Sequence, residues 1–245
     1  MFYTLCYWFL CFMLYSFIGY LAEITCCSIN NKKLVMNRGF CLGPYLPIYG
    51  FSCVIMNLFL AKYNHDLITL FVMSAFVCTV MEYMTSLILE KIFHARWWDY
   101  TEKKFNLSGR VCLENSCLFG LGGVVIVRVI HPFVEGIIKS LPLKALFIIA
   151  IVLFVIFLVD VIITITTMCQ VKIASMKFTA KDATEEISKR VRSEIIKNKS
   201  LMLHMLNAFP KIELSNHDPL GRIKKILAKQ KEEYKKKKEK SKRKK

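Results

Sequence analysis

The sequence LFIIAIVLFVIFLVDVIITITTM, at residues 146–168, contains a single charged side chain, Asp160. A helix needs about 20 mainly apolar residues to cross the hydrocarbon core of a bilayer, which is about 30 Å thick. This stretch is therefore predicted to span a membrane. The composition agrees, because 55% of the 245 residues are hydrophobic and the mean hydropathy is +0.41. A soluble domain is ordinarily less apolar and richer in charge.

Four further apolar stretches lie upstream of this one. We therefore predict an all-α fold for residues 1–169, a polytopic membrane bundle of about five transmembrane helices. A buried helix of a soluble core is the alternative for each stretch, above all for the fourth, which contains Arg128 and His131. The five predicted spans are residues 2–24, 44–63, 67–91, 114–134 and 145–169.

Charge is divided unequally along the chain. Residues 1–169 hold 12 Lys and Arg against 9 Asp and Glu, whereas residues 170–245 hold 23 against 9. Basic segments stay on the cytoplasmic side of a membrane. With five spans, the N-terminus is then outside the cell membrane and the C-terminus is cytoplasmic. Loops 25–43 and 90–115, which this topology places inside, hold eight basic residues, whereas the outer loops hold three. An even number of spans would break this agreement.

The basic tail, residues 170–245, is predicted to be a cytoplasmic helical segment with a disordered end. A helix is expected over residues 182–207, and the final KKKKEKSKRKK is too charged to pack. Lysines beside a cytoplasmic leaflet gain about 1 kcal/mol each from anionic lipid. We expect the tail to bind anionic lipid headgroups. Nucleic-acid binding is not expected, because the rest of the chain is embedded in a membrane.

A polar stripe runs along the third predicted span. Thr79, Glu82, Ser86 and Glu90 follow one another at spacings of three and four residues, which place them on one helix face. Ionisable groups inside a membrane are costly and often functional. One interpretation is a polar cavity open to the cytoplasm, with Glu82 at its deepest point as a proton carrier or substrate contact. The cavity candidates are Glu82, Ser86, Glu90, Glu23 and Glu114.

The alternative interpretation is structural. The same carboxylates can pair with arginines of the neighbouring loops and hold the helices in register. This second interpretation is favoured for Glu23, Glu90 and Glu114, which lie near the membrane interface. For Glu82 both interpretations stay open.

Two loops on the predicted cytoplasmic side have unusual compositions. Residues 36–50, MNRGFCLGPYLPIYG, contain three glycines and two prolines, which favour a re-entrant or broken-helix element. Residues 96–116, RWWDYTEKKFNLSGRVCLENS, begin with aromatic residues typical of the membrane interface. Arg96 and Asp99 can pair within this loop. The candidate loop contacts are Arg38, Arg96, Trp97, Trp98, Asp99 and Arg110.

The motifs do not indicate catalysis in this chain. The ten cysteines include no C-x-x-C pair and no zinc spacing with histidine, and there is no phosphate-binding P-loop. We therefore expect no catalytic residues, no metal and no cofactor, and we do not expect an enzyme.

Three long stretches carry a resemblance to a known family: NRGFCLGPYLPIYG (37–50), MEYMTSLILEKIFHARWWDY (81–100) and FNLSGRVCLENSCLFGLGG (105–123). HMLNAFPKI (204–212) matches more weakly. On these residues the chain resembles the bacterial CmpB-like, type IV ABC-transporter permeases. The resemblance implies the membrane-spanning subunit of an importer or exporter, with ATP hydrolysis in a separate ATPase subunit. Five spans suit half a transporter, which implies a homodimer. The resemblance assigns no site residues.

Two other functions remain as alternatives. A non-transporting scaffold or regulatory protein would act through its inner loops and tail, and would tolerate Glu82→Gln. A membrane enzyme acting on lipid would need a compact catalytic set, for which His94 and Asp99 are the only hint. Glutamine at position 82 therefore distinguishes a transporter from a scaffold.

Overall fold

The computed structural model describes residues 1–32, 39–93, 95–179 and 213–214. This part of the chain is almost entirely helical, and its few strands are two residues long. The elements in chain order are α1 (Phe2–Asn31), α2 (Pro47–Leu60), the 3-10 turn η1 (Ala61–Tyr63), α3 (Leu67–Phe93), β1 (Ala95–Arg96), β2 (Asn106–Leu107), β3 (Val111–Cys112), α4 (Leu113–Val125), the π-helix η2 (Ile126–Ile130), α5 (His131–Lys139), α6 (Leu143–Thr179) and β4 (Glu213–Leu214).

Four of the described helical segments are long and apolar enough to cross a membrane. They are Phe2–Ile29 in α1, Leu67–Phe93 in α3, Leu113–Lys139, and Leu143–Cys169 in α6. The third of these runs through α4, η2 and α5 without a break in the helix. The prediction of an all-α, polytopic membrane fold is therefore confirmed.

The second predicted span, residues 44–63, is shorter than expected. Helix α2 begins only at Pro47 and has 14 residues, a rise of about 21 Å at 1.5 Å per residue. That length falls short of the roughly 30 Å that a bilayer core requires. Proline lacks the N–H that a helix interior needs but is well tolerated in the first turn, so it marks the start of the helix. Residues 39–46 precede it as non-helical backbone.

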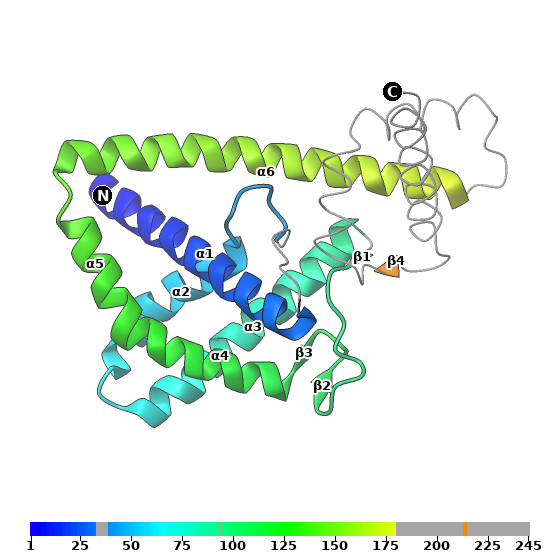
Figure 1. Cartoon of the computed structure of the whole chain (residues 1–245), viewed down its shortest axis with the longest axis horizontal. Coiled ribbons are helices and arrows are strands. Elements are labelled where there is room, and N and C mark those ends of the chain that lie inside the picture. Colours follow the sequence, from blue (N-terminus) through cyan, green and yellow to red (C-terminus); the bar gives the residue numbers. More distant parts are fainter. Residues whose placement is uncertain (33–38, 94, 180–212, 215–245) are drawn as a thin grey trace, which may run out of the picture.

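The helices run between two ends of the bundle (Figure 1). The N-terminus of α1 and the turn between α5 and α6 lie at one end, where η1 also turns the chain back into α3. Strands β1, β2 and β3 lie towards the other end. Helix α2 runs from the middle of the bundle towards the first end. The orientation of these ends relative to the cytoplasm stays a prediction.

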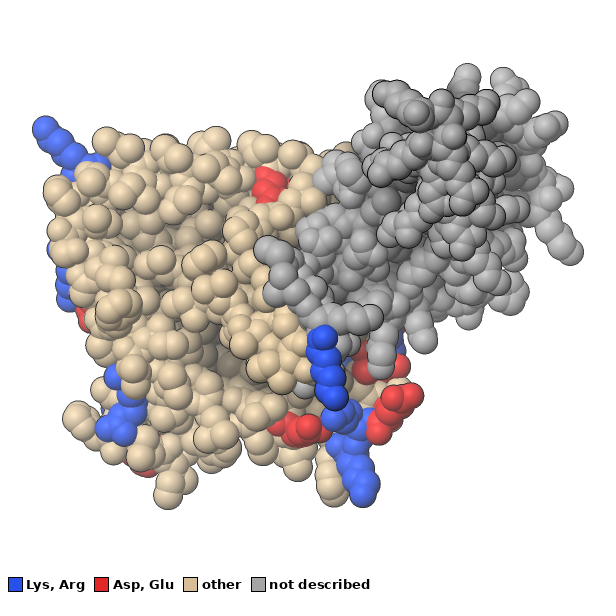
Figure 2. Space-filling view, in the orientation of Figure 1, with Lys and Arg blue, Asp and Glu red and all other residues tan. Residues whose placement is uncertain are grey.

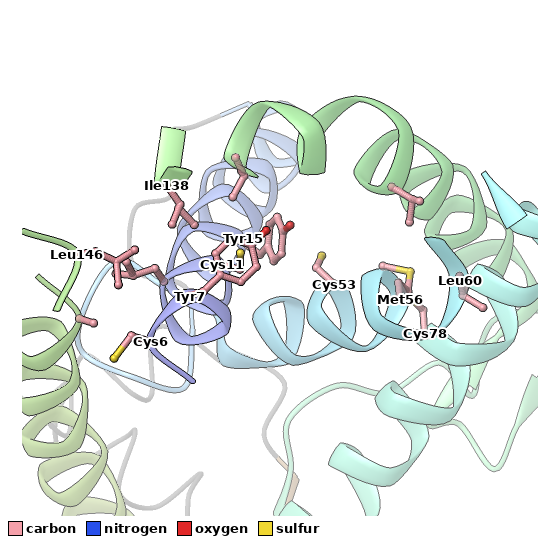
Figure 3. Packing of buried hydrophobic residues seen from close by; sticks show 14 of the residues in the cluster. Cys6, Tyr7, Cys11, Tyr15, Cys53, Met56, Leu60, Cys78, Ile138 and Leu146 are labelled. Carbon is pink, nitrogen blue, oxygen red and sulfur yellow. The ribbon is translucent and has the colours of Figure 1, made fainter. Parts of the chain in front are cut away.

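The core forms where α1, α2, α3 and α5 meet, with the start of α6 beside them (Figure 3). Small residues let the helices approach closely. A Cβ atom at Gly50 of α2 would lie 2.1 Å from Ser16 Oγ and 2.7 Å from the Phe12 carbonyl oxygen of α1. The labelled core residues in Figure 3 are Cys6, Tyr7, Cys11, Tyr15, Cys53, Met56, Leu60, Cys78, Ile138 and Leu146.

We expect Gly50→Ala to lower the free energy of unfolding by about 1–3 kcal/mol, because a methyl group forced into a filled contact pushes helices apart. The measurement is unfolding of the purified protein in mild detergent. Gly136→Ala is the matched control, since nothing lies within 4 Å of a Cβ atom at Gly136. Equal stability of the two variants would show that the contact between α1 and α2 is less tight than the structure has it.

The outer surface is that of a membrane protein. Figure 2 shows most of the described charged side chains at the two ends, with a broad uncharged surface between them. Helix α6 exposes large apolar side chains on several of its faces, including Ile148, Phe154 and Ile162. Exposed apolar surface of this extent suits contact with lipid tails rather than water.

Of the tail, residues 170–245, the structure describes the end of α6 and strand β4. Strand β4 pairs antiparallel with β1, with Ala95 opposite Leu214 and Arg96 opposite Glu213. This contact places one point of the tail beside the loop between α3 and α4. The predicted helix at residues 182–207, the lysine-rich end and Arg38 all lie outside the described residues.

Candidate functional site

The loop between α3 and α4 folds back against α3. Strands β2 and β3 pair antiparallel, and the turn between them contains Ser108 and Gly109 with positive φ angles of 55° and 66°. The Asn106 side chain accepts a hydrogen bond from the Gly109 N–H at 3.0 Å and stabilises the turn. The Tyr100 N–H donates to the Gly109 carbonyl oxygen at 2.8 Å. These bonds hold Tyr100 against the third helix.

One carboxylate of the polar stripe, that of Glu90, forms ion pairs with both arginines of this loop. Glu90 Oε2 lies 2.7 Å from Arg110 Nη1 and 3.1 Å from Arg96 Nε. Arg110 Nη1 also donates to Ser86 Oγ at 3.2 Å. The Trp98 indole N–H donates to the Arg110 carbonyl oxygen at 2.9 Å. Glu90 and Ser86 thus fasten the loop to α3, as the structural interpretation of Glu90 expects.

The predicted pair between Arg96 and Asp99 is wrong. Arg96 pairs with Glu90, whereas Asp99 accepts hydrogen bonds from the Thr101 N–H at 3.0 Å and the Thr101 hydroxyl at 2.9 Å. An aspartate closes such a turn with its own neighbours more readily than it reaches a long side chain. Trp97 is buried, with its ring centroid 5.5 Å from that of Phe93.

Glu82 lies deeper along the stripe, one helical turn from Ser86 and about two from Glu90, and has different partners. It is only 6% exposed. Its Oε1 accepts a hydrogen bond from the Tyr100 hydroxyl at 3.1 Å, and its Oε2 is buried without a hydrogen-bond partner. In the described part of the chain, no lysine or arginine forms an ion pair with Glu82. Burial and the charge of Glu82 raise the pKa of Tyr100 above its ordinary value, so the phenol stays a proton donor.

Glu23 of α1 forms a second carboxylate–tyrosine pair. The Tyr49 hydroxyl of α2 donates to Glu23 Oε2 at 3.2 Å, and the Cys27 thiol donates to Oε1 at 3.3 Å. Two carboxylate–tyrosine pairs, Glu23 with Tyr49 and Glu82 with Tyr100, therefore lie towards the end of the bundle that carries the loop. We call Glu23, Tyr49, Glu82 and Tyr100 the carboxylate cluster.

Glu114, a cavity candidate for which a structural pairing was favoured, does not join this cluster. It points towards solvent and pairs with Lys103 at 2.8 Å, with both side chains more than half exposed. It opens α4, whose other face turns to α3, so its side chain projects away from the bundle. The contact between these helices comes instead from Thr79, whose hydroxyl donates to Ser116 Oγ at 2.7 Å. Arg38 and His94 lie outside the described residues.

Asp160 of α6 holds a second site that the sequence argument did not assign. Its Oδ1 accepts hydrogen bonds from the Leu42 N–H at 3.0 Å and the Thr164 hydroxyl at 3.1 Å. Its Oδ2 accepts from the Gly43 N–H at 2.8 Å and from the Tyr45 hydroxyl. The buried carboxylate thus satisfies the non-helical backbone between α1 and α2. The available sequence signals were a lone charge in the most apolar span and, far away in the chain, a Gly-Pro segment between two predicted spans.

This contact supports the predicted re-entrant or broken-helix element. Irregular backbone survives at membrane depth only where protein or water satisfies its polar groups. The aromatic rings of Tyr45 and Phe157 lie 5.7 Å apart beside Asp160, and Cys41 is buried next to them. The segment at residues 39–46 therefore packs between α1 and α6 rather than facing lipid.

A third polar group lies in the other half of the bundle. The Tyr15 hydroxyl and His131 Nδ1 are 2.5 Å apart, and the Asn57 amide donates to the Tyr15 hydroxyl at 3.5 Å. His131 follows directly on the π-helix η2, a local widening often found at functional positions. The Trp8 ring stacks on His131 at 6.1 Å between centroids. Three helices are thereby connected at one buried point.

We expect Tyr15→Phe to lower the free energy of unfolding by about 1–3 kcal/mol, because it removes the hydroxyl that the partly buried His131 imidazole and the buried Asn57 amide share. The measurement is again unfolding in detergent. Tyr3→Phe is the control, because Tyr3 is exposed at 43%. An unchanged stability for Tyr15→Phe would mean that water replaces the hydroxyl.

These features define a multi-pass α-helical membrane protein with a carboxylate cluster at one end of its bundle. Residues 10–165 match the family model described as "Putative ABC-transporter type IV", of the CmpB group. Because the match covers well over half of the chain, the protein belongs to this family. No curated protein and no solved structure matches the chain significantly.

Proposed function

We propose that the chain is the membrane-spanning permease subunit of an ABC-type transporter and works with a separate ATPase subunit. The family match supports a role in such a system. Hydrolysis is assigned to another chain because this sequence contains no phosphate-binding P-loop.

The observation that carries the proposal is the link between the loop and the carboxylate cluster. In a transporter, an ATPase must act on a surface that is coupled to the path through the membrane. The loop between α3 and α4 has such a connection, since Arg96 and Arg110 bind Glu90 while Tyr100 binds Glu82 on the same helix. Movement of this loop would therefore change the surroundings of Glu82. We propose this loop as the coupling surface, facing the cytoplasm beside the basic tail.

A second copy of the chain belongs to the same proposal. One chain offers four spanning helices and the shorter α2, which is a small bundle to enclose a path. Two copies would enclose it between them. We propose a homodimer on these grounds.

The experiment is affinity purification of the tagged protein from native membranes. An ATPase subunit in stoichiometric amount is the expected result, and Arg96→Glu with Arg110→Glu should reduce the amount recovered. Glu135→Gln is the control, because Glu135 lies at the opposite end of the bundle and pairs with Lys139 there. Repeated absence of any ATPase would overturn the proposal.

A non-transporting scaffold is the second candidate, and the pairing of β4 with β1 favours it. That contact ties the tail to the same loop, as a protein acting through its loops and tail would require. The two candidates differ at Glu82. A scaffold retains its function with glutamine at this position, whereas a permease that uses the carboxylate cluster loses transport.

A further inference from the structure

Strand β1 is the first element of the loop between α3 and α4, and it lies where the loop leaves α3. Arg96 Nε of β1 lies 3.1 Å from Glu90 Oε2. The next residue, Trp97, is buried, and its ring centroid lies 5.5 Å from that of Phe93, the last residue of α3. A segment that pairs with β1 therefore acts on the base of the loop.

The backbone of β1 pairs with a segment of the tail. Strand β4 runs antiparallel to β1, with Ala95 opposite Leu214 and Arg96 opposite Glu213. The two strands lie side by side in Figure 1 and form a two-stranded sheet. Main-chain hydrogen bonds hold a strand that is added to an exposed sheet edge. The backbone of β1 is thus able to receive an extended segment.

We propose that β1 is a docking edge for an extended strand, that residues 213–214 of the same chain occupy it, and that a partner subunit displaces them when it engages the loop. We call the pairing of β4 with β1 the latch. The docking edge and its occupant stand independently of the proposed function. The displacing partner rests on the proposed function, because that partner is the ATPase subunit proposed to act on this loop.

The latch is short enough to open. Two residues of each strand are paired, and each hydrogen bond shifts a folding equilibrium in water by only about two- to tenfold. The pairing persists because both strands belong to one chain, and an attached segment reaches an effective concentration on the order of millimolar. A partner that covers a larger part of the loop can therefore displace β4.

The charges in the sequence suit this register. Glu213 stands opposite Arg96, and opposite charges at directly opposed positions favour an antiparallel pair. Within residues 211–216, KIELSN, Glu213 is the only acidic residue. A shift of the tail by two residues would keep the same faces of the strand but would bring Lys211 or Ser215 opposite Arg96. The observed register is therefore the one that charge selects.

The first experiment is disulfide cross-linking of the full chain in membranes. Directly opposed residues of an antiparallel pair have Cα atoms about 4.5–5.5 Å apart, which is within the span of a disulfide. Ala95→Cys with Leu214→Cys should therefore form a disulfide under mild oxidation. Mass spectrometry identifies this bond among the ten native cysteines. Ala95→Cys with Glu213→Cys is the matched control and should cross-link much more slowly, because neighbouring residues of a strand face opposite sides.

Two results of this experiment would overturn the proposal. Equal cross-linking of the two cysteine pairs, or none, would mean that β4 does not occupy β1 in the register described. A disulfide between two copies, seen as a dimer on a denaturing gel, would mean that the tail pairs with a second copy instead. A disulfide within one copy, formed by Ala95→Cys with Leu214→Cys and not by the control, supports the docking edge and its occupant.

The second experiment measures competition between the latch and the partner. The ATPase subunit recovered by affinity purification is titrated against the full chain in lipid nanodiscs. Oxidation of Ala95→Cys with Leu214→Cys closes the latch and should raise the half-saturating ATPase concentration by roughly tenfold, within the usual range of coupling between two binding events. Reductant should reverse this change, and the wild type treated in the same way is the control. Glu213→Pro with Leu214→Pro removes two N–H donors from β4 and should lower the same concentration by about two- to tenfold.

Unchanged or tighter ATPase binding after oxidation would overturn the displacement of the latch. Should the proline variant fail to give a monodisperse protein, the oxidised and reduced forms of the cysteine pair decide the question by themselves. Absence of any ATPase in the purification would overturn the proposed function and the displacing partner together, whereas the cross-link would still decide the docking edge and its occupant.

Discussion

Asp160→Ala is expected to lower the free energy of unfolding by about 3–5 kcal/mol, because it leaves several buried donors without an acceptor. In the wild type, Asp160 accepts from two backbone N–H groups and two hydroxyls, and it is only 8% exposed.

In Asp160→Ala, the loss of structure should appear first in the segment at residues 39–46. Cys41 is 1% exposed in the folded protein, so its thiol should react slowly with a maleimide reagent. In Asp160→Ala the segment loses its anchor, and labelling at Cys41, located by mass spectrometry, should become much faster. Unfolding in detergent gives the free energy, and the labelling site shows where the loss arises.

Asp160→Asn and Glu114→Ala are the comparisons. Asparagine keeps one acceptor oxygen and should lose less stability than alanine, while Glu114→Ala removes an exposed carboxylate and should change it little. If Asp160→Ala were as stable as Glu114→Ala and left Cys41 protected, the carboxylate would not be the anchor of the segment.

The apolar pattern predicted the long helices because their lengths follow from burial in lipid, a local property of the sequence. The prediction for residues 67–91 agrees closely with α3 (Leu67–Phe93). It was less accurate for residues 44–63, where hydropathy counts apolar residues but not backbone geometry. Pro44 and Pro47 were visible signals that the helix begins late, and α2 indeed starts at Pro47.

The partners of the polar groups could not be predicted in the same way, because they depend on tertiary contacts. Asp160 binds Gly43, 117 residues earlier in the chain, and nothing local to either residue indicates the other. Spacing along α3 did place Glu82, Ser86 and Glu90 on one face. It could not show that Arg96 and Arg110 would both pair with Glu90, because that pairing depends on how the loop folds back against α3.

The β2–β3 hairpin of this loop shows what the sequence could not predict. Gly109 has a φ of 66°, and a Cβ atom there would lie 2.6 Å from Asp99 Oδ1. The glycine was visible in the sequence, but only the folded turn shows that it lets Tyr100 reach Glu82. The site therefore follows from the geometry of a loop rather than from its composition.

The second large effect is expected at Arg110. Replacing it by methionine should lower the free energy of unfolding by about 2–4 kcal/mol, because a largely buried ion pair loses its positive member while the carboxylate stays in place. The Arg110 side chain is 10% exposed and lies 2.7 Å from Glu90. Methionine keeps the apolar contacts of the Arg110 side-chain methylenes. The lost free energy of unfolding therefore measures the contribution of the guanidinium group.

Arg96→Met is a closely matched comparison, since Arg96 contacts the same Glu90 oxygen at 3.1 Å but its side chain is 31% exposed. A pair that water screens contributes roughly 0–1 kcal/mol. The two variants remove the same chemical group from the same carboxylate, so they differ in burial and in the hydrogen bond from Arg110 to Ser86. Unfolding in detergent measures both. Losses of equal size would show that the arginines share Glu90 equally, and the loop would then be fastened to α3 by two surface contacts. A larger loss for Arg110 instead makes it the side chain through which a force on the loop reaches Ser86, one turn from Glu82.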